Sequence, residues 1–288
     1  MNPAAPDLTA RIARLFVYPV KSCAGVEVRE AMLTETGLDL DRAWMVVDEG
    51  GEFVSQRELP RMALVRPQLK LNEVVLRAPG MLALHLAVDT VEEAVRVRVW
   101  DDEVPAYDMG AVAAQWFSDF LGRKLRLVRF DPEFRRLSNQ EWTQGAEALN
   151  QFSDGYPLLL AGTASLELLN QKLSAQGKPA VGMERFRPNI VVEGLDAHDE
   201  DRLDVLRIDT GDGEVQLRPV KPCARCPIPN IDPATAESDP VVSDTLQAYR
   251  RNDRLDGAVT FGMNAIVLEG VDRTLRVGQA VRAAWKFD

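Results

Sequence analysis

Short β-rich runs separated by turn residues fill most of this 288-residue chain, and this alternation restricts its fold more than any other feature. The clearest example is RAWMVVDEGGEFVSQ, residues 42–56, in which two such runs flank a Glu-Gly-Gly turn, as in a β-hairpin. Helical periodicity is strongest in AVAAQWFSDFLG, residues 111–122, which closes with the glycine typical of helix ends. The pattern predicts a mainly β fold with a few helices (α+β), made of barrels or sandwiches and not of a parallel α/β sheet.

A polar and irregular stretch, residues 131–155, interrupts these runs. The chain length suits two domains or one large one, and the stretch is interpreted as a domain boundary or a long ordered loop. Placing a boundary near its start predicts domains over residues 1–128 and 129–288. Beyond the stretch, YPLLLAG predicts a buried strand. TASLELLNQKLSAQG predicts a helix with Thr163 as its N-cap and Gly177 just past its end.

Charge and cysteine content exclude several classes of protein. The formal net charge of −10 argues against nucleic-acid and membrane-surface binding, because both need a basic face. No apolar run reaches the length of a membrane span, and the first residues lack the pattern of a signal peptide. With three cysteines and no export signal, we expect a cytoplasmic protein without structural disulfides. From the acidic charge we expect no nucleic-acid or membrane partner.

The stretch RPVKPCARCPIPNIDP, residues 218–233, gathers positive charge around two of the three cysteines. Arg218, Lys221 and Arg225 surround Cys223 and Cys226, and no acidic residue occurs before Asp232. A neighbouring guanidinium stabilises a thiolate, and flanking prolines stiffen the backbone that carries it. A thiolate is in turn a good ligand for soft metals. These residues predict a loop thiolate in a positive pocket.

Three other interpretations of the two cysteines remain open. A zinc site usually needs four ligands, whereas this pair stands alone, far in sequence from Cys23 and both histidines. A redox dithiol usually begins a helix, which the following prolines disfavour. Inert buried thiols are common, but a core segment does not ordinarily carry Lys and Arg on both sides. The residues alone therefore favour the reactive thiolate without identifying its function.

The cysteine stretch, extended to KPCARCPIPNIDPATAE, resembles the signature loop of MOSC-domain proteins. Further segments match in family order, and those before residue 128 resemble the β-barrel domain that precedes MOSC in one branch: VYPVKSCAGVEV, GLDLDRAWMVVDEGGEFVSQRELPRMALV, FSDGYPLLLAGTASLELLN, RFRPNIVV and FGMNAIVLEG. That branch includes the mitochondrial amidoxime reducing component and bacterial reductases of N-hydroxylated compounds. The resemblance implies a β-barrel-like N-terminal domain followed by a MOSC β-barrel domain.

The resemblance also implies a molybdenum cofactor, in which a pterin that carries a phosphate chelates the metal through a dithiolene. Cys226 matches the cysteine that supplies a further sulfur ligand, so it is the implied catalytic residue and metal ligand. Cys23 and Cys223 are interpreted as spare thiols. The implied cofactor-binding residues are Lys21, Ser22, Arg42, Gly155, Tyr156, Arg187, Asn189, Arg225, Cys226 and Asn264.

These implied contacts differ in how well the side chains match. Lys21 and Ser22 suit a phosphate, and the planar groups of Arg187 and Asn189 suit the amide edges of a pterin. Asn264 stands where the amidoxime-reducing branch has tyrosine. The side chains of the Gly-Tyr pair at residues 155–156 differ from those of relatives, so only a backbone contact is expected there. Without the resemblance, several of the basic residues would be interpreted as solvated strand ends.

The implied reaction is the reduction of small N-hydroxylated compounds, N–OH to N–H, with loss of water. Some bacterial relatives carry an iron–sulfur module after MOSC, and this sequence lacks its cysteines. A separate electron-transfer protein of the ferredoxin or flavoprotein type is therefore expected. The alternatives are transfer of sulfur to the molybdenum cofactor, which in relatives involves a pyridoxal-phosphate domain absent from this sequence, or carriage of the cofactor without turnover.

Overall fold

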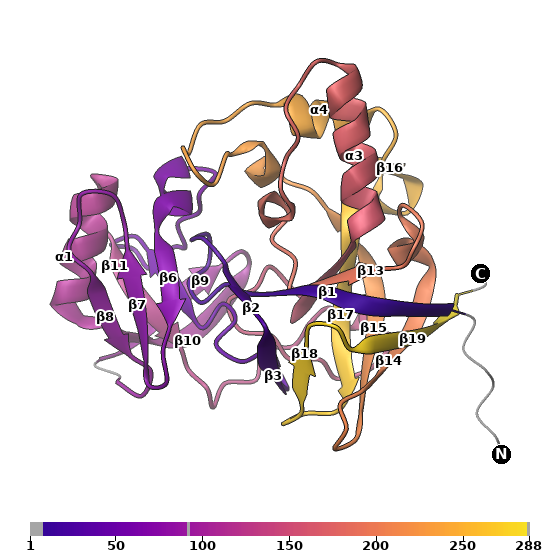
Figure 1. Cartoon of the computed structure of the whole chain (residues 1–288). Helices are drawn as coiled ribbons and strands as arrows, with labels where there is room; N and C mark the ends of the chain where they lie inside the picture. Colours follow the sequence, from indigo (N-terminus) through magenta and orange to yellow (C-terminus); the bar gives the residue numbers. More distant parts are fainter. Residues whose placement is uncertain (1–7, 91–92, 287–288) are drawn as a thin grey trace.

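Seven strands close into a β-barrel in the computed structural model, which describes residues 8–90 and 93–286 (Figure 1). In order around the barrel they are β12 (Leu158–Gly162), β13 (Ile190–Glu193), β1 (Leu8–Val17), β19 (Ala280–Trp285), β14 (Leu203–Asp209), β15 (Glu214–Ala224) and β17 (Ala258–Glu269). β17 pairs back with β12, and only the pairing of β12 with β13 is parallel. Alternate apolar side chains of these strands fill the interior, so the closed barrel has no exposed edge. The predicted mainly β fold is confirmed.

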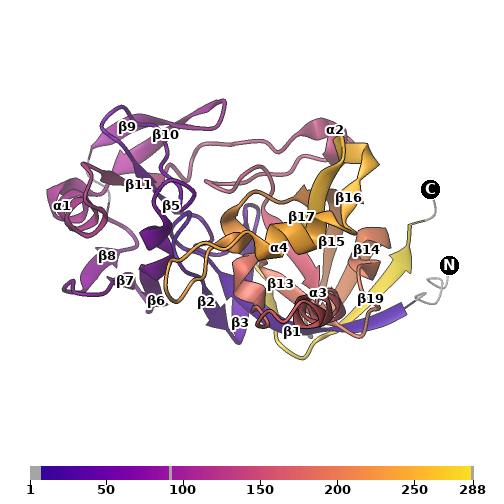
Figure 2. The ribbon, with the colours of Figure 1, turned by 90° about the horizontal axis from the view of Figure 1, so that it is seen from above.

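Two smaller antiparallel sheets lie beside the barrel (Figure 2). One contains β5 (Trp44–Val47), β11 (Arg126–Phe130), β10 (Asp102–Asp108) and β9 (Ala94–Val99), and the other β6 (Arg66–Leu69), β7 (Glu73–Arg77) and β8 (Leu84–Ala87). The buried face of α1 (Gly110–Leu121) packs against side chains of both sheets. Gly122 ends this helix with a left-handed φ of 70°, as the sequence predicts.

The remaining elements are short and connect or cover the sheets. The strands are β2 (Val26–Val28), β3 (Glu30–Thr34), β4 (Gly37–Leu38), β16 (Arg251–Asn252) and β18 (Thr274–Arg276). The α-helices are α2 (Gln140–Thr143), α3 (Thr163–Ala175) and α4 (Val241–Gln247), and the 3₁₀ turns are η1 (Pro60–Leu64), η2 (Met183–Arg185), η3 (Asp199–Arg202), η4 (Ile228–Asn230) and η5 (Asp253–Leu255). Every helix among the described residues is too short or too polar to span a bilayer.

The predicted N-cap of α3 is wrong by one residue. Gly162, with extended dihedral angles, is the N-cap, and Thr163 is already helical. The buried Glu200 carboxylate accepts hydrogen bonds from the Gly162 N–H and from the Ser165 hydroxyl. A carboxylate at a helix N-terminus satisfies free donors, so a threonine cap is not needed there. Gly177 follows the end of the helix with a φ of 70°, as predicted.

The first strand joins the barrel of the C-terminal half. β1 pairs on one side with β13 and on the other with β19, and its neighbour β3 pairs with β18. The predicted division between residues 128 and 129 stays a prediction, but a unit cut there would lack β1. Its barrel would then open and leave β13 and β19 each with an unpaired edge.

We therefore expect a fragment of residues 129–288 to show no cooperative unfolding in urea, followed by circular dichroism. The register places Leu8 of β1 opposite Ala283 of β19 in an antiparallel pair, so a short turn after residue 286 can carry residues 8–17 back along β19. This rearranged fragment should regain a cooperative transition because the barrel closes again. Equal cooperativity of the two fragments would show that β1 is dispensable.

Closure between β12 and β17 depends on one glycine. Gly262 has a φ of 75°, and a Cβ built there would lie 2.6 Å from the carbonyl oxygen of Leu160. Gly257 has a similar φ of 77° but open space around it. We expect Gly257→Ala to lower the free energy of unfolding by about 1–2 kcal/mol through backbone strain alone. Gly262→Ala should cost a further ~1–3 kcal/mol because the strands must move apart. Equal losses in urea denaturation would contradict the close approach.

Candidate functional site

All ten predicted site residues line one cavity of about 690 Å³. They arrive from separate parts of the chain: the segment after β1, the turn before β5, the polar stretch before β12, the residues before β13, the loop after β15, and β17. The predicted convergence of Lys21, Arg187 and Arg225 is therefore present in the structure. That these residues bind a cofactor stays a prediction.

Three of the ten residues have a left-handed backbone. Ser22, Arg42 and Arg187 have φ values of 68°, 52° and 60°. Such conformations are uncommon for residues other than glycine and cost roughly 1–3 kcal/mol each. They persist only where surrounding contacts hold them, and they concentrate at functional sites.

Two arginines lie over one buried tyrosine ring. The guanidinium carbons of Arg42 and Arg187 are 4.4 Å and 4.3 Å from the ring centroid of Tyr18. Arg42 also donates to the carbonyl oxygen of Arg187 at 3.1 Å, and Arg187 donates to the carbonyl oxygen of Cys23. Burial, together with the nearby charge of Arg42, lowers the pKa of Arg187 to about 10. Arg187 therefore stays charged at neutral pH, as an anion-binding residue must.

The Asn189 side chain connects three parts of the site. Its oxygen accepts hydrogen bonds from the Leu159 N–H and from Arg42, both at 3.1 Å. Its amide group donates to the carbonyl oxygen of Phe16 at 3.3 Å. Because the side chain is buried and already holds these groups, Asn189 positions Arg42 against strands β12 and β1.

Lys21 is a buried cation with one acidic partner. Its ammonium group donates to the Phe152 carbonyl oxygen at 2.8 Å and to Asp154 Oδ1 at 2.5 Å. Burial lowers the pKa of Lys21, and the Asp154 carboxylate opposes that shift. The Trp100 indole N–H also donates to Asp154 Oδ1 at 3.1 Å. The Asp154 side chain itself is 71% exposed, so it faces the opening of the cavity.

Arg136 orders the loop beneath Asp154, and the sequence analysis did not identify it. Its buried guanidinium donates to Asp102, to the side chain of Asn150, and to the carbonyl oxygens of Gln151 and Ser153. No feature of the sequence distinguishes it from its exposed neighbour Arg135. The exposed Trp100, with Phe53 and Arg57 against its ring, forms the rim of the cavity and was also missed. The sequence feature that could have indicated this rim is a tryptophan followed by acidic residues in a turn.

The cysteine loop differs from expectation in one contact. Cys223 and Cys226 are both half-buried free thiols that line the cavity. Arg225 donates to Cys223 Sγ at 3.0 Å and to the Phe186 carbonyl oxygen at 2.9 Å, and its described partners do not include Cys226. Residues two apart in an extended segment share a face, which brings the arginine to the first cysteine and not to its direct neighbour.

Two further residues considered in the sequence analysis, Arg218 and Cys23, lie outside the lining of the cavity. Arg218 lies apart from the cavity, 3.6 Å from Asp204, so it does not contribute to the positive pocket. Cys23 is fully buried, and burial raises the pKa of its thiol to about 12. That thiol stays protonated, in agreement with its interpretation as a spare thiol.

The cavity is basic although the protein is acidic. Its lining contains seven Lys or Arg and three Asp side chains, in a chain of net charge −10. Among the described residues, two buried polar atoms of the lining, Arg225 Nε and the Tyr156 hydroxyl, have no hydrogen-bond partner. Burial raises the pKa of Tyr156 to about 12, so its hydroxyl remains a donor. Unpaired buried donors are costly, which favours an anionic or acceptor-rich ligand in this cavity.

Comparison with known proteins agrees with this arrangement. Residues 9–124 match the MOSC N-terminal beta barrel domain, and residues 148–282 match the MOSC domain. Mitochondrial amidoxime reducing component 2 of Homo sapiens is 36% identical over 254 residues, which cover 84% of this chain and 73% of that protein. Mitochondrial amidoxime-reducing component 1 of Homo sapiens is 34% identical over 286 residues, covering 94% and 82%. Molybdenum cofactor sulfurase of Bos taurus is 31% identical over 270 residues, covering 88% of this chain but 30% of that protein.

The pairing of Lys21 with Asp154 predicts how the cavity responds to anions. Asp154→Asn removes a carboxylate that competes for the ammonium group, so inorganic phosphate should bind about tenfold more tightly to the cofactor-free protein. Lys21→Met should abolish most of that binding. Isothermal titration calorimetry measures both.

Asp101→Asn is the matched control, because Asp101 lines the same cavity without an ion pair to Lys21 in the described structure. It should change phosphate binding much less. Weaker or unchanged binding in Asp154→Asn would contradict the idea that this carboxylate occupies the place of an anionic ligand.

Proposed function

Because the chain belongs to the MOSC family, as a member with an N-terminal MOSC β-barrel domain, we propose that it is a molybdenum-cofactor-dependent oxidoreductase that reduces N-hydroxylated compounds. The family resemblance noted in the sequence is confirmed by these matches. The activity rests on one further observation: the half-buried Cys226 thiol and the basic residues line a single cavity.

The residues of this cavity fit such a cofactor. Lys21 and Ser22 suit a terminal phosphate, while Arg187 carries planar donors suited to a pterin. Arg225 Nε and the Tyr156 hydroxyl are donors that lack a partner among the described residues. Those residues contain no group of three His, Cys, Asp or Glu side chains arranged to hold a metal ion, so a metal that arrives with its own chelate suits the site better than a bare ion.

Cys226 is the residue that would reach the metal, because a soft thiolate suits molybdenum. When bound, the cofactor supplies the redox chemistry, and the protein supplies binding, orientation and electrostatics. The positive lining would stabilise the anionic parts of the cofactor, and Asn189 and Arg136 would act by holding Arg42 and the loop at residues 150–154 in place. The proposed reaction takes up two electrons and two protons for each N–OH group and releases one molecule of water.

The electrons would come from a separate electron-transfer protein of the ferredoxin or flavoprotein type. The sequence has three cysteines, fewer than the four that usually hold an iron–sulfur cluster, and two of them line the candidate site. The cytoplasmic location and the lack of nucleic-acid or membrane partners likewise stay predictions.

A second candidate function is sulfur transfer to the cofactor or carriage of the cofactor. The similarity to molybdenum cofactor sulfurase over 88% of this chain favours it. Molybdenum analysis combined with a reductase assay separates the candidates. Bound molybdenum with no turnover of any N-hydroxylated compound would favour carriage or sulfur transfer.

The test of the main proposal compares serine variants of the two loop cysteines. We expect Cys226→Ser to lower the rate of benzamidoxime reduction more than about a hundredfold, since even residues that only orient metal ligands cost roughly 10–100-fold. A reduced dye supplies the electrons in this assay. Cys223→Ser is the matched control, because Cys223 lines the same cavity three residues earlier, and it should keep most of the activity. Full activity in Cys226→Ser would overturn the assignment, and loss in Cys223→Ser alone would transfer it to Cys223.

A further inference from the structure

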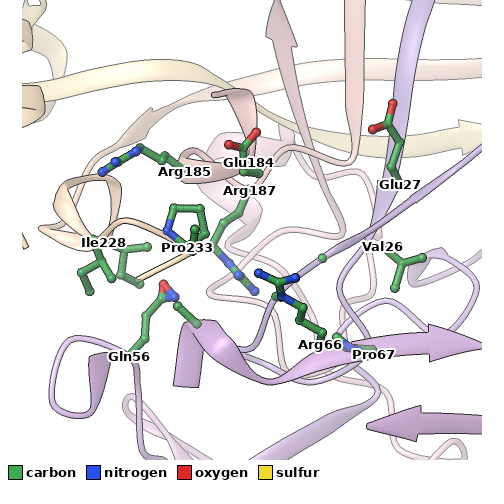
Figure 3. Close-up of a pocket in the computed structure, with 15 residues that line it drawn as sticks. Val26, Glu27, Gln56, Arg66, Pro67, Glu184, Arg185, Arg187, Ile228 and Pro233 are labelled. Carbon is green, nitrogen blue, oxygen red and sulfur yellow. The ribbon is translucent and has the colours of Figure 1, made fainter. Parts of the chain in front are cut away.

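A second cavity, of about 440 Å³, shares Arg187 with the candidate cofactor cavity, and Figure 3 shows the residues that line it. Its lining comes from residues 24–27, Gln56 and residues 63–67 in the N-terminal half, and from residues 184–187 and 228–234 in the C-terminal half. Arg187 and Ile228 line both this cavity and the candidate cofactor cavity. Because Ile228 follows Cys226 by two residues, the second cavity lies beside the loop that carries the proposed metal ligand.

Two of the five charged side chains that line the second cavity have an ion-pair partner. Arg185 donates to Asp232 at 2.8 Å, and Glu27 accepts from Arg14 at 2.7 Å. The Glu184 side chain folds back against Gly182, and Figure 3 shows its carboxylate directed away from the arginines in the cavity. The net charge inside the cavity is therefore determined by the remaining charged residues.

Arg66 and Arg187 supply that charge. Figure 3 shows both guanidinium groups directed into the same space, and the Gln56 side chain lines it as well. Within residues 8–90 and 93–286, the Arg66 guanidinium has no hydrogen-bond acceptor and no acidic partner. Gln56 donates through Nε2 to the Ser22 carbonyl oxygen at 3.2 Å, which fixes its position in the wall. Two cations facing one space favour a ligand with an anionic group.

The rest of the wall is apolar. It includes Val26, Ala63, Pro67, Ile228, Ile231 and Pro233. A volume of this size with apolar walls and a few polar groups is typical of small-molecule sites. The combination suits a compact apolar body, such as one aromatic ring, that carries a carboxylate.

We propose that this second cavity is the substrate pocket, and that it selects N-hydroxylated compounds with an aromatic body and a carboxylate held by Arg66. This inference rests on the proposed reductase function. The shared wall of Arg187 and Ile228 places such a substrate next to the cofactor cavity, and the carboxylate determines which substrates are held there.

Two substrates with the same reactive group test the pocket. Benzamidoxime and 4-carboxybenzamidoxime differ only in the carboxylate, so the wild-type protein with its cofactor should have the lower KM for the second. Arg66→Ala should raise the KM for 4-carboxybenzamidoxime by about tenfold or more, because it removes a charged hydrogen bond. The kcat and the kinetics with benzamidoxime should change little. Arg66 is exposed, so the substitution should not disturb folding.

Arg61→Ala is the matched control. Arg61 is also exposed, lies five residues earlier against the Phe120 ring, and is outside the cavity. It should leave the substrate preference unchanged. Equal effects of the two variants, or no preference in the wild-type protein, would overturn the proposed pocket while leaving the reductase function intact.

A binding measurement separates the pocket from the reaction. Benzoate should bind more tightly than its neutral isostere benzamide in isothermal titration calorimetry, and Arg66→Ala should remove the difference. This result without any reductase activity would support the pocket and overturn the proposed function. No binding difference together with no activity would overturn both.

Discussion

The pairing of β1 with β13 and β19 is the constraint on which the rest of the molecule depends. It closes the barrel and also fixes the point at which the chain leaves the barrel for the rest of the N-terminal half. The chain leaves the barrel at Val17 and at once forms the segment of residues 18–23, which supplies Tyr18, Lys21 and Ser22 to the site. Barrel closure and the position of the cavity are therefore consequences of the same strand pairing.

The acidic protein maintains a basic cavity because only three of the seven cations in its lining, Lys21, Arg42 and Arg136, have carboxylate partners among the described residues. Backbone carbonyl oxygens accept from Lys21, Arg187 and Arg225. A carbonyl dipole fixes a side chain and compensates part of its desolvation without cancelling its charge. Asp154 does pair with Lys21, but its side chain is 71% exposed to solvent. The positive charge is thus positioned by the fold and remains available to an anion.

Local patterns and family order predicted much of this structure. The strand-rich composition, α1 with its closing glycine and the gathering of ten residues at one cavity agree with the sequence analysis. The position of β1 in the barrel could not be predicted from the sequence. Its pairing with residues 280–283 joins opposite ends of the chain and has no local sequence signal. The contacts of Arg136 and Arg225 could not be predicted from the sequence either, since each depends on which acceptors the folded chain brings to the guanidinium.

The three residues with strained backbone show why the site needs both halves of the chain. Ser22 and Arg42 lie before the polar stretch and Arg187 lies after it, yet all three have positive φ. The bonds that hold two of them cross between the two halves, because Arg42 donates to the Arg187 carbonyl oxygen and Arg187 donates to the Cys23 carbonyl oxygen. Strained conformations persist only where surrounding structure compensates their cost. Neither half alone contains both ends of these bonds, so the geometry that presents the arginines to a ligand exists only where the halves meet.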